Sequence, residues 1–211
     1  EDSANDIFSA AVPARDEFGY FGYLKKMVLT LHNARMMRRG KLPFHGAFVR
    51  MALRGGLDRN VLIIGDTGAG KSEMLEAFRV IGAESIRDII VIADDMGSLD
   101  IDDGGEIIGY GTEIGAFLRL DDLRPGYAFG QIDRSIIMSP SQVNARIVIP
   151  VTAYGTVVKG HRVDMVLYAN NYEQVDDERP VIERFSSAEQ AFGVFREGTV
   201  MSKGTTSSSG I

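Results

Sequence analysis

Residues 65–72 read Gly-Asp-Thr-Gly-Ala-Gly-Lys-Ser, which is the G-x-x-x-x-G-K-S pattern of a phosphate-binding P-loop. The apolar run 61–64 before it is typical of a buried strand, and residues 72–78 after it have helical spacing. A strand, a glycine-rich turn and a helix in this order direct backbone N–H groups and the positive end of the helix at a phosphate. The pattern therefore predicts a nucleoside triphosphate site rather than a turn that only joins a strand to a helix.

The motif assigns a role to each of its residues. Lys71 is expected to reach the β- and γ-phosphates, and the hydroxyl of Ser72 is expected to ligate Mg²⁺. The remaining positions are expected to surround the phosphates with their backbone: Gly65, Asp66, Thr67, Gly68, Ala69 and Gly70.

Composition excludes several other classes of protein. The 211 residues are enough for one domain or two small ones, and 45% hydrophobic with 25% charged residues is ordinary for a globular protein. A net charge of −6 and the absence of a long basic run argue against a nucleic-acid partner. No apolar stretch approaches the ~20 residues of a membrane span, so we expect no membrane partner and a cytoplasmic location. The chain has no cysteine, which excludes disulfides and thiolate chemistry.

Along the chain, strands outnumber helices, which favours an α/β fold with a mixed sheet. We expect an N-terminal arm over 1–19 and a nucleotide-binding catalytic domain over 20–211. Because the chain starts at Glu1 without a methionine, a fragment of a longer protein is one interpretation. Helices are predicted from about Tyr20 to Arg38, after the P-loop, and from a capping box at 187–190 through Phe195. Strands are predicted over 43–53, 61–64, 89–93, 135–138, 146–151 and 165–169, with an acidic, glycine-rich stretch from 97 to 105.

A P-loop needs a carboxylate to hold its metal ion, usually at the end of a neighbouring apolar strand. Asp94 and Asp95 follow the apolar run 89–93 and fit that requirement, although an ordinary acidic loop would look the same. His45 begins the strand that precedes the P-loop strand, so it is a candidate for the same site or else a packed or surface residue.

Several segments together resemble the ATP-dependent phosphoenolpyruvate carboxykinases. The resemblance spans Tyr20 to Thr206, and its order and spacing are more specific than any single segment except the P-loop. The related HPr kinase/phosphorylase family resembles the centre of the chain closely. The matching segments are Tyr20 to Lys26 (Y-F-G-Y-L-K-K), Leu42 to His45 (L-P-F-H), Ile92 to Asp95 (I-A-D-D), Gly115 to Arg119 (G-A-F-L-R), Asn144 to Arg146 (N-A-R), and Ser187 to Ala191 with Gly204-Thr205.

The resemblance implies the fold of the carboxykinase C-terminal domain and a site with ATP, Mg²⁺ and a second cation, often Mn²⁺. By this similarity Lys26, His45 and Asp95 would hold the second cation, and Lys26 would have to be neutral, a state that burial and its neighbour Lys25 would favour. Charge on the moving phosphoryl group would be neutralised by Lys71, Arg146 and Arg119. The catalytic set implied is Lys25, Lys71, Asp94 and Arg146.

The implied reaction converts oxaloacetate and ATP to phosphoenolpyruvate, CO₂ and ADP. Before Tyr20 the one cation is Arg15, and nothing there resembles the segment with which the family binds the substrate carboxylate. Two alternatives stay open: a kinase of the HPr kinase type, in which Asp94 or Asp95 activates a hydroxyl, and a non-catalytic nucleotide-binding module.

Overall fold

A computed structural model describes residues 1–15, 21–65, 69, 71–119, 136–138, 146–170 and 182–197. Its helices are α1 (Phe21–Arg38), α2 (Lys71–Ile81), a short 3-10 turn η2 (Gly82–Glu84), α3 (Tyr154–Val158) and α4 (Ala188–Glu197). Its strands are β1 (Leu42–Leu53), β2 (Asp58–Ile64), β3 (Ile86–Ala93), β4 (Met96–Ile101), β5 (Ile107–Gly111), β6 (Gly115–Arg119), β7 (Ile136–Met138), β8 (Arg146–Pro150), β9 (His161–Arg162) and β10 (Met165–Tyr168).

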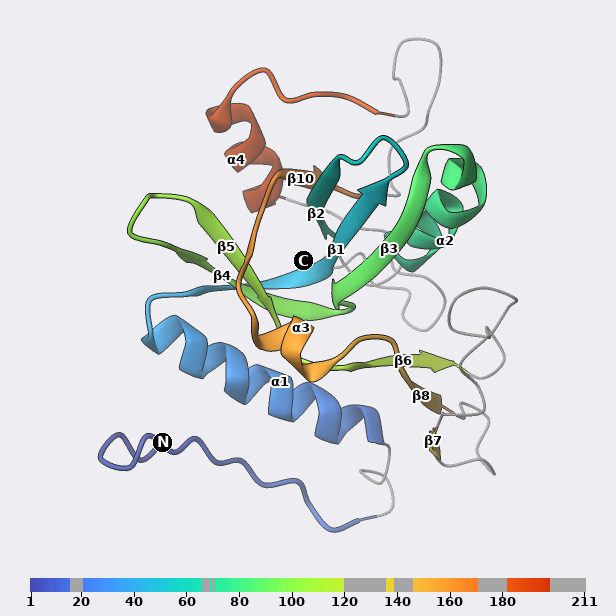
Figure 1. Cartoon of the computed structure of the whole chain (residues 1–211). Coiled ribbons are helices and arrows are strands. Elements are labelled where there is room, and N and C mark those ends of the chain that lie inside the picture. Colours follow the sequence, from blue (N-terminus) through green and yellow to red (C-terminus); the bar gives the residue numbers. More distant parts are fainter. Residues whose placement is uncertain are drawn as a thin grey trace.

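These strands form a mixed sheet, as the sequence predicts. Its order is β10-β2-β1-β4-β5-β9, and β3 joins it by pairing with β1. The pair β10–β2 is parallel, whereas all the other pairs in this sheet are antiparallel. A smaller antiparallel sheet of order β6-β8-β7 lies at one end of the molecule (Figure 1).

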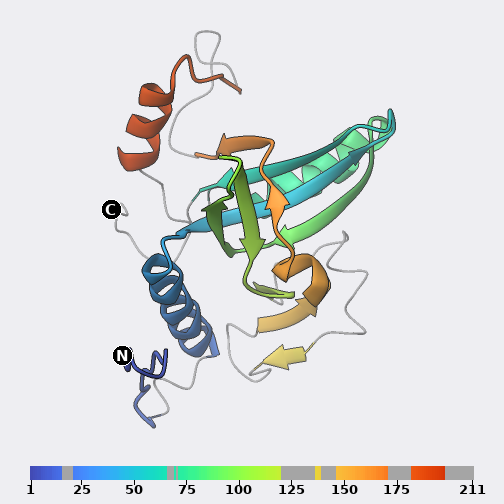
Figure 2. The ribbon, with the colours of Figure 1, turned by 60° about the vertical axis from the view of Figure 1, so that its left-hand side comes forward.

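The long strand β1 changes its partner along one edge. Its first four residues, 42–45, pair with β4, and residues 48–53 pair with β3. Figure 2 shows β1 running on from the end of α1, past the β4–β5 hairpin, to its turn into β2. Because β3 and β4 are consecutive in the chain, only Asp94 and Asp95 connect them. These two residues therefore lie at the point where β1 changes from one neighbour to the other.

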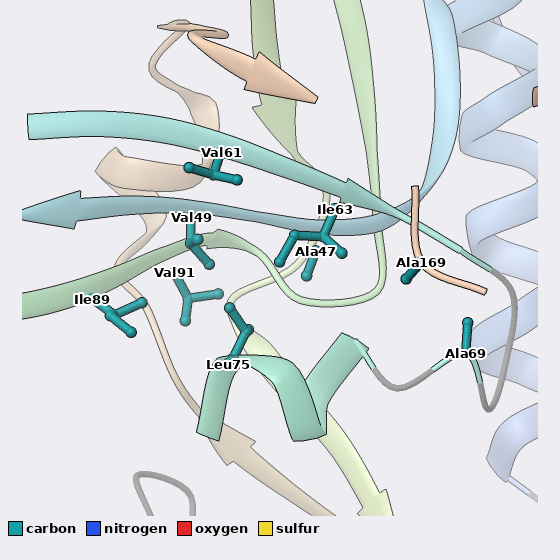
Figure 3. Close-up of a cluster of buried hydrophobic side chains, with 9 residues drawn as sticks. All are labelled: Ala47, Val49, Val61, Ile63, Ala69, Leu75, Ile89, Val91 and Ala169. Atoms are coloured by element: carbon teal, nitrogen blue, oxygen red, sulfur yellow. The ribbon is translucent and has the colours of Figure 1, made fainter. Parts of the chain in front are cut away.

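The core has a layer on each face of the sheet. On one face the buried side chain of Leu75 points from α2 toward Val49, Ile63 and Val91 (Figure 3). Burying one such leucine stabilises the fold by about 1.5–3 kcal/mol. The opposite face buries a second cluster: Phe44, Phe48, Leu62, Ile92 and Ala93. Since side chains alternate along a strand, His45 lies on the same face of β1 as Ala47 and Val49, which is the α2 face.

The outer elements attach by side-chain contacts. The N-terminal residues run beside α1 (Figure 1), where Glu1 pairs with Arg38 and Asp6 pairs with Arg35 and Arg39. Helix α4 meets β10 through an edge-to-face contact, with the ring centroids of Tyr168 and Phe195 5.2 Å apart.

Most expected elements are present, with ends that differ by a few residues. One half of the capping box is confirmed, since the N–H of Gln190 donates to Ser187 Oγ. Gln190 Oε1 accepts from the N–H of Ser186, one residue before the expected N-cap. The acidic stretch 97–105, to which no strand was assigned, contains most of β4 and its turn toward β5. Acidic and glycine residues mask the strand pattern there, while pairing with β1 and β5 stabilises it. In the described part of the chain, no helix has the length and apolar character needed to cross a bilayer.

Candidate functional site

The backbone around Asp95 is held by neighbouring segments. The N–H of Gly46 donates to the carbonyl of Asp95 at 2.9 Å, and the N–H of Gly65 lies 3.5 Å from the carbonyl of His45. A Cβ on Gly46 would collide with the carbonyl oxygen of Ile63 in β2, so only glycine lets the two strands approach this closely. The strand end that carries Asp95 is therefore fixed beside the first residue of the 65–72 motif.

Three side chains converge on the Asp95 carboxylate. His45 Nε2 lies 2.8 Å from Oδ1, Lys25 Nζ lies 2.9 Å from Oδ2, and Lys26 Nζ lies 3.4 Å from Oδ2. Burial on its own would raise the pKa of Asp95, but the hydrogen bond to His45 and the charge of Lys25 outweigh it and hold that pKa far below its ordinary value. Asp95 is thus a firmly ionised carboxylate with a nitrogen donor on each side.

The two lysines differ in their surroundings, and one expectation is wrong. The side chain of Lys26 is 57% exposed, so the burial expected of this lysine is not found. Lys25 is the buried lysine, with 11% exposure, and its ammonium also lies 5.3 Å from the centroid of the Phe117 ring. Burial would lower the pKa of Lys25, but the carboxylates of Glu113 and Asp95 outweigh this and raise it. Consecutive helical residues point about 100° apart, which explains the difference.

Glu113 belongs to this cluster and was missed by sequence reasoning. It follows β5, and its Oε2 lies 3.4 Å from Lys25 Nζ. Burial raises the pKa of Glu113 to about 7; Lys25 opposes the shift, whereas Asp95 and Asp94 add to it. The signal that could have found it is a lone carboxyl group two residues before the segment 115–119, which resembles the carboxykinases.

Lys71 begins α2 and is buried, with 9% exposure. Its Nζ donates to the carbonyl oxygen of Gly65 at 2.7 Å. Since the N–H of Gly65 faces His45 O, the backbone of Gly65 lies between Lys71 and the Asp95 cluster. The structure therefore brings Lys71, His45, Asp95, Lys25 and Lys26 into one region.

For several other expected site residues, the structure describes only the backbone or nothing at all. Asp94 is half-buried beside Asp95, and Ala69 is buried. Arg119 of β6 and Arg146 of β8 are directly opposite each other in the antiparallel register. Only the backbone is described for these two arginines and for Ser72 in α2. Four motif residues lie outside the described residues: Asp66, Thr67, Gly68 and Gly70.

The donor set fits a hard or borderline divalent cation. The carboxylate oxygen is a ligand that suits Mg²⁺ and Mn²⁺, and the imidazole nitrogen 2.8 Å from it suits the borderline first-row divalent cations. Among the described residues, no three His, Asp or Glu side chains lie close enough to hold a metal ion. A cation here would take His45 and Asp95 from the protein and complete its shell with water or substrate oxygens, and Lys26 could join it only as a neutral amine.

Comparison with known proteins adds no assignment. No protein-family model matches this chain, and a search of curated proteins gave no match.

Proposed function

We propose that this chain catalyses ATP-dependent phosphoryl transfer of the phosphoenolpyruvate carboxykinase type. In this reaction oxaloacetate loses CO₂, and the oxygen of the resulting enolate takes the γ-phosphoryl group of ATP, leaving ADP. The observation that carries the proposal is the convergence of Lys25, Lys26 and His45 on Asp95, next to the start of the 65–72 motif.

Each group has a part that follows from its chemistry. Lys71 and the backbone of 65–72 would hold the triphosphate, with Mg²⁺ at Ser72. His45 and Asp95 would hold a second cation such as Mn²⁺, which stabilises negative charge on the substrate. Lys25 would contribute a positive charge at all times, since two carboxylates keep it protonated. Arg119 and Arg146 would neutralise the transferred phosphoryl group, the main catalytic contribution in this class of reaction.

The HPr kinase-type alternative needs a carboxylate that removes a proton from a hydroxyl group. Asp95 suits that role poorly, because three nitrogen groups surround it and its pKa is far below the ordinary value. A carboxylate of this kind is better suited to holding a cation. The kinase alternative would therefore depend on Asp94.

The test is ADP release from ATP in the presence of Mg²⁺ and Mn²⁺, with and without oxaloacetate. We expect oxaloacetate-dependent release that Lys71→Ala abolishes. Lys159→Ala is the matched control, because it removes an exposed lysine after α3, beside Arg50 and Ile90 and outside the 65–72 motif. Binding of ATP without oxaloacetate-dependent release would refute the carboxykinase proposal and leave the kinase and the non-catalytic module, which a phosphoryl-acceptor assay separates.

A further inference from the structure

The Lys25 ammonium is shared unequally between two carboxylates. Its Nζ lies 2.9 Å from Asp95 Oδ2, a full hydrogen bond, and 3.4 Å from Glu113 Oε2, a longer contact. Asp95 also faces His45 through its other oxygen, whereas Glu113 contacts only Lys25 among the ion pairs of the described residues. Lys25 therefore occupies part of the carboxylate that the proposed cation would use.

Glu113 has spare acceptor capacity. Its Oε1 is buried and has no hydrogen-bond partner among the described residues. A buried carboxylate oxygen without a donor is costly, and an ammonium that moved toward Glu113 would relieve that cost. The Phe117 ring, 5.3 Å from the Lys25 ammonium, adds a favourable surface on which the cation can remain.

A divalent cation at His45 and Asp95 would repel the ammonium that now lies 2.9 Å from the same carboxylate. We propose that Glu113 is a positioning residue that accepts the Lys25 ammonium when a divalent cation takes Asp95, and that it thereby makes Asp95 accessible to the cation. No proton moves in this step: Lys25 exchanges one carboxylate partner for another. The inference rests on the proposed cation site and adds to it a residue that touches neither cation nor substrate.

The experiment is Mn²⁺ titration followed by the electron paramagnetic resonance signal of free Mn²⁺, at about pH 8, where Glu113 is mainly ionised. Glu113→Gln keeps the shape but removes the charge, so Lys25 stays on Asp95. We expect Mn²⁺ to bind roughly tenfold more weakly. Glu113→Asp keeps the charge but withdraws the oxygens by one methylene, and we expect most of the same loss. Unchanged Mn²⁺ affinity in Glu113→Gln refutes the proposal. Unchanged Mn²⁺ affinity in Glu113→Asp also contradicts it, because the position of the carboxylate that accepts Lys25 would then have no effect.

A double-mutant cycle with Lys25→Met tests whether Glu113 acts through Lys25. Without an ammonium that competes for Asp95, adding Glu113→Gln should change the Mn²⁺ affinity less than about twofold. An equal loss in both backgrounds overturns the inference. Two negative results lead to different conclusions. If the unaltered chain does not bind Mn²⁺, both the cation site and this inference are refuted. If the chain binds Mn²⁺ tightly and substitution of Glu113 does not change the affinity, only the inference is refuted. Thermal melting of each variant verifies that it is folded.

Discussion

His45 Nε2 lies 2.8 Å from Asp95 Oδ1, although 50 residues separate them in the chain. They meet because β1 pairs first with β4 and then with β3, and Asp95 is in the two-residue connection between those strands. The contact thus depends on one change of strand partner.

Replacing Asp95 should remove the proposed cation site. In Asp95→Asn the negative charge that attracts both the cation and Lys25 is lost. Loss of a residue that only supports a metal ligand typically weakens metal binding roughly 10–100-fold, so loss of the ligand Asp95 should weaken Mn²⁺ binding by at least that much. The broken pair with the buried Lys25 should also lower the free energy of unfolding, but by less than the ~3 kcal/mol of an unpaired buried charge, because Glu113 still accepts the ammonium. Spin-resonance titration and urea unfolding measure the two effects. Asp103→Asn, in the exposed turn after β4, is the control, and equal Mn²⁺ binding by both variants would contradict the site.

Lys71→Met should weaken ATP binding without unfolding the chain. Methionine preserves length and apolar packing at this buried position but removes the charge that would meet the phosphates. We expect a loss of roughly tenfold or more in ATP affinity, about 1.4 kcal/mol, measured by calorimetry. Lys159→Met should bind ATP as the unaltered chain does. An ATP affinity that is the same in all three proteins would rule out a role for Lys71 in phosphate binding.

Glu113 should make the stability of the protein depend on pH. Its pKa is about 7 in the folded chain, against the 4.5 of an ordinary glutamate, so between these values the folded protein binds the proton more tightly than the unfolded chain does. The free energy of unfolding should therefore fall as pH rises through this window, by on the order of 3 kcal/mol in total. Asp95, with its strongly lowered pKa, stays ionised throughout.

Urea unfolding at about pH 5 and about pH 8 measures this fall. Glu113→Gln should flatten the dependence, because it removes the titrating group that Lys25, Asp95 and Asp94 surround. Glu84→Gln, an exposed carboxylate in η2, should leave the dependence intact. The interpretation would be wrong if Glu113→Gln retained the full decrease.

Gly46→Ala should damage both the fold and the site. The added methyl group would meet the carbonyl of Ile63, and separating β1 from β2 there would move His45 away from Gly65. We expect a destabilisation of about 1–3 kcal/mol together with weaker Mn²⁺ binding. Gly55→Ala is the matched control, since open space surrounds its position in the β1–β2 turn. Equal melting temperatures for the two variants would contradict the close approach of these strands.

Local order could be predicted from the sequence because it depends on neighbouring residues. The apolar run 89–93, the helical spacing through α1 and the capping box at Ser187 each lie within one element, and each element is present. The strand β4 was missed because its acidic, glycine-rich sequence has no clear period and is stabilised by pairing with β1 and β5.

The residue types available to the site can be read from the sequence: the 65–72 motif, two lysines, a histidine and two consecutive aspartates. How these residues meet depends on the packing of the chain, since Lys25 and Asp95 are 70 residues apart and strand register is a non-local property. It also decided that Lys25 is the buried lysine and that Glu113 is its second partner. The physical reason is that a lone carboxylate carries no periodic signal, whereas burial and charge partners arise only when distant segments pack together.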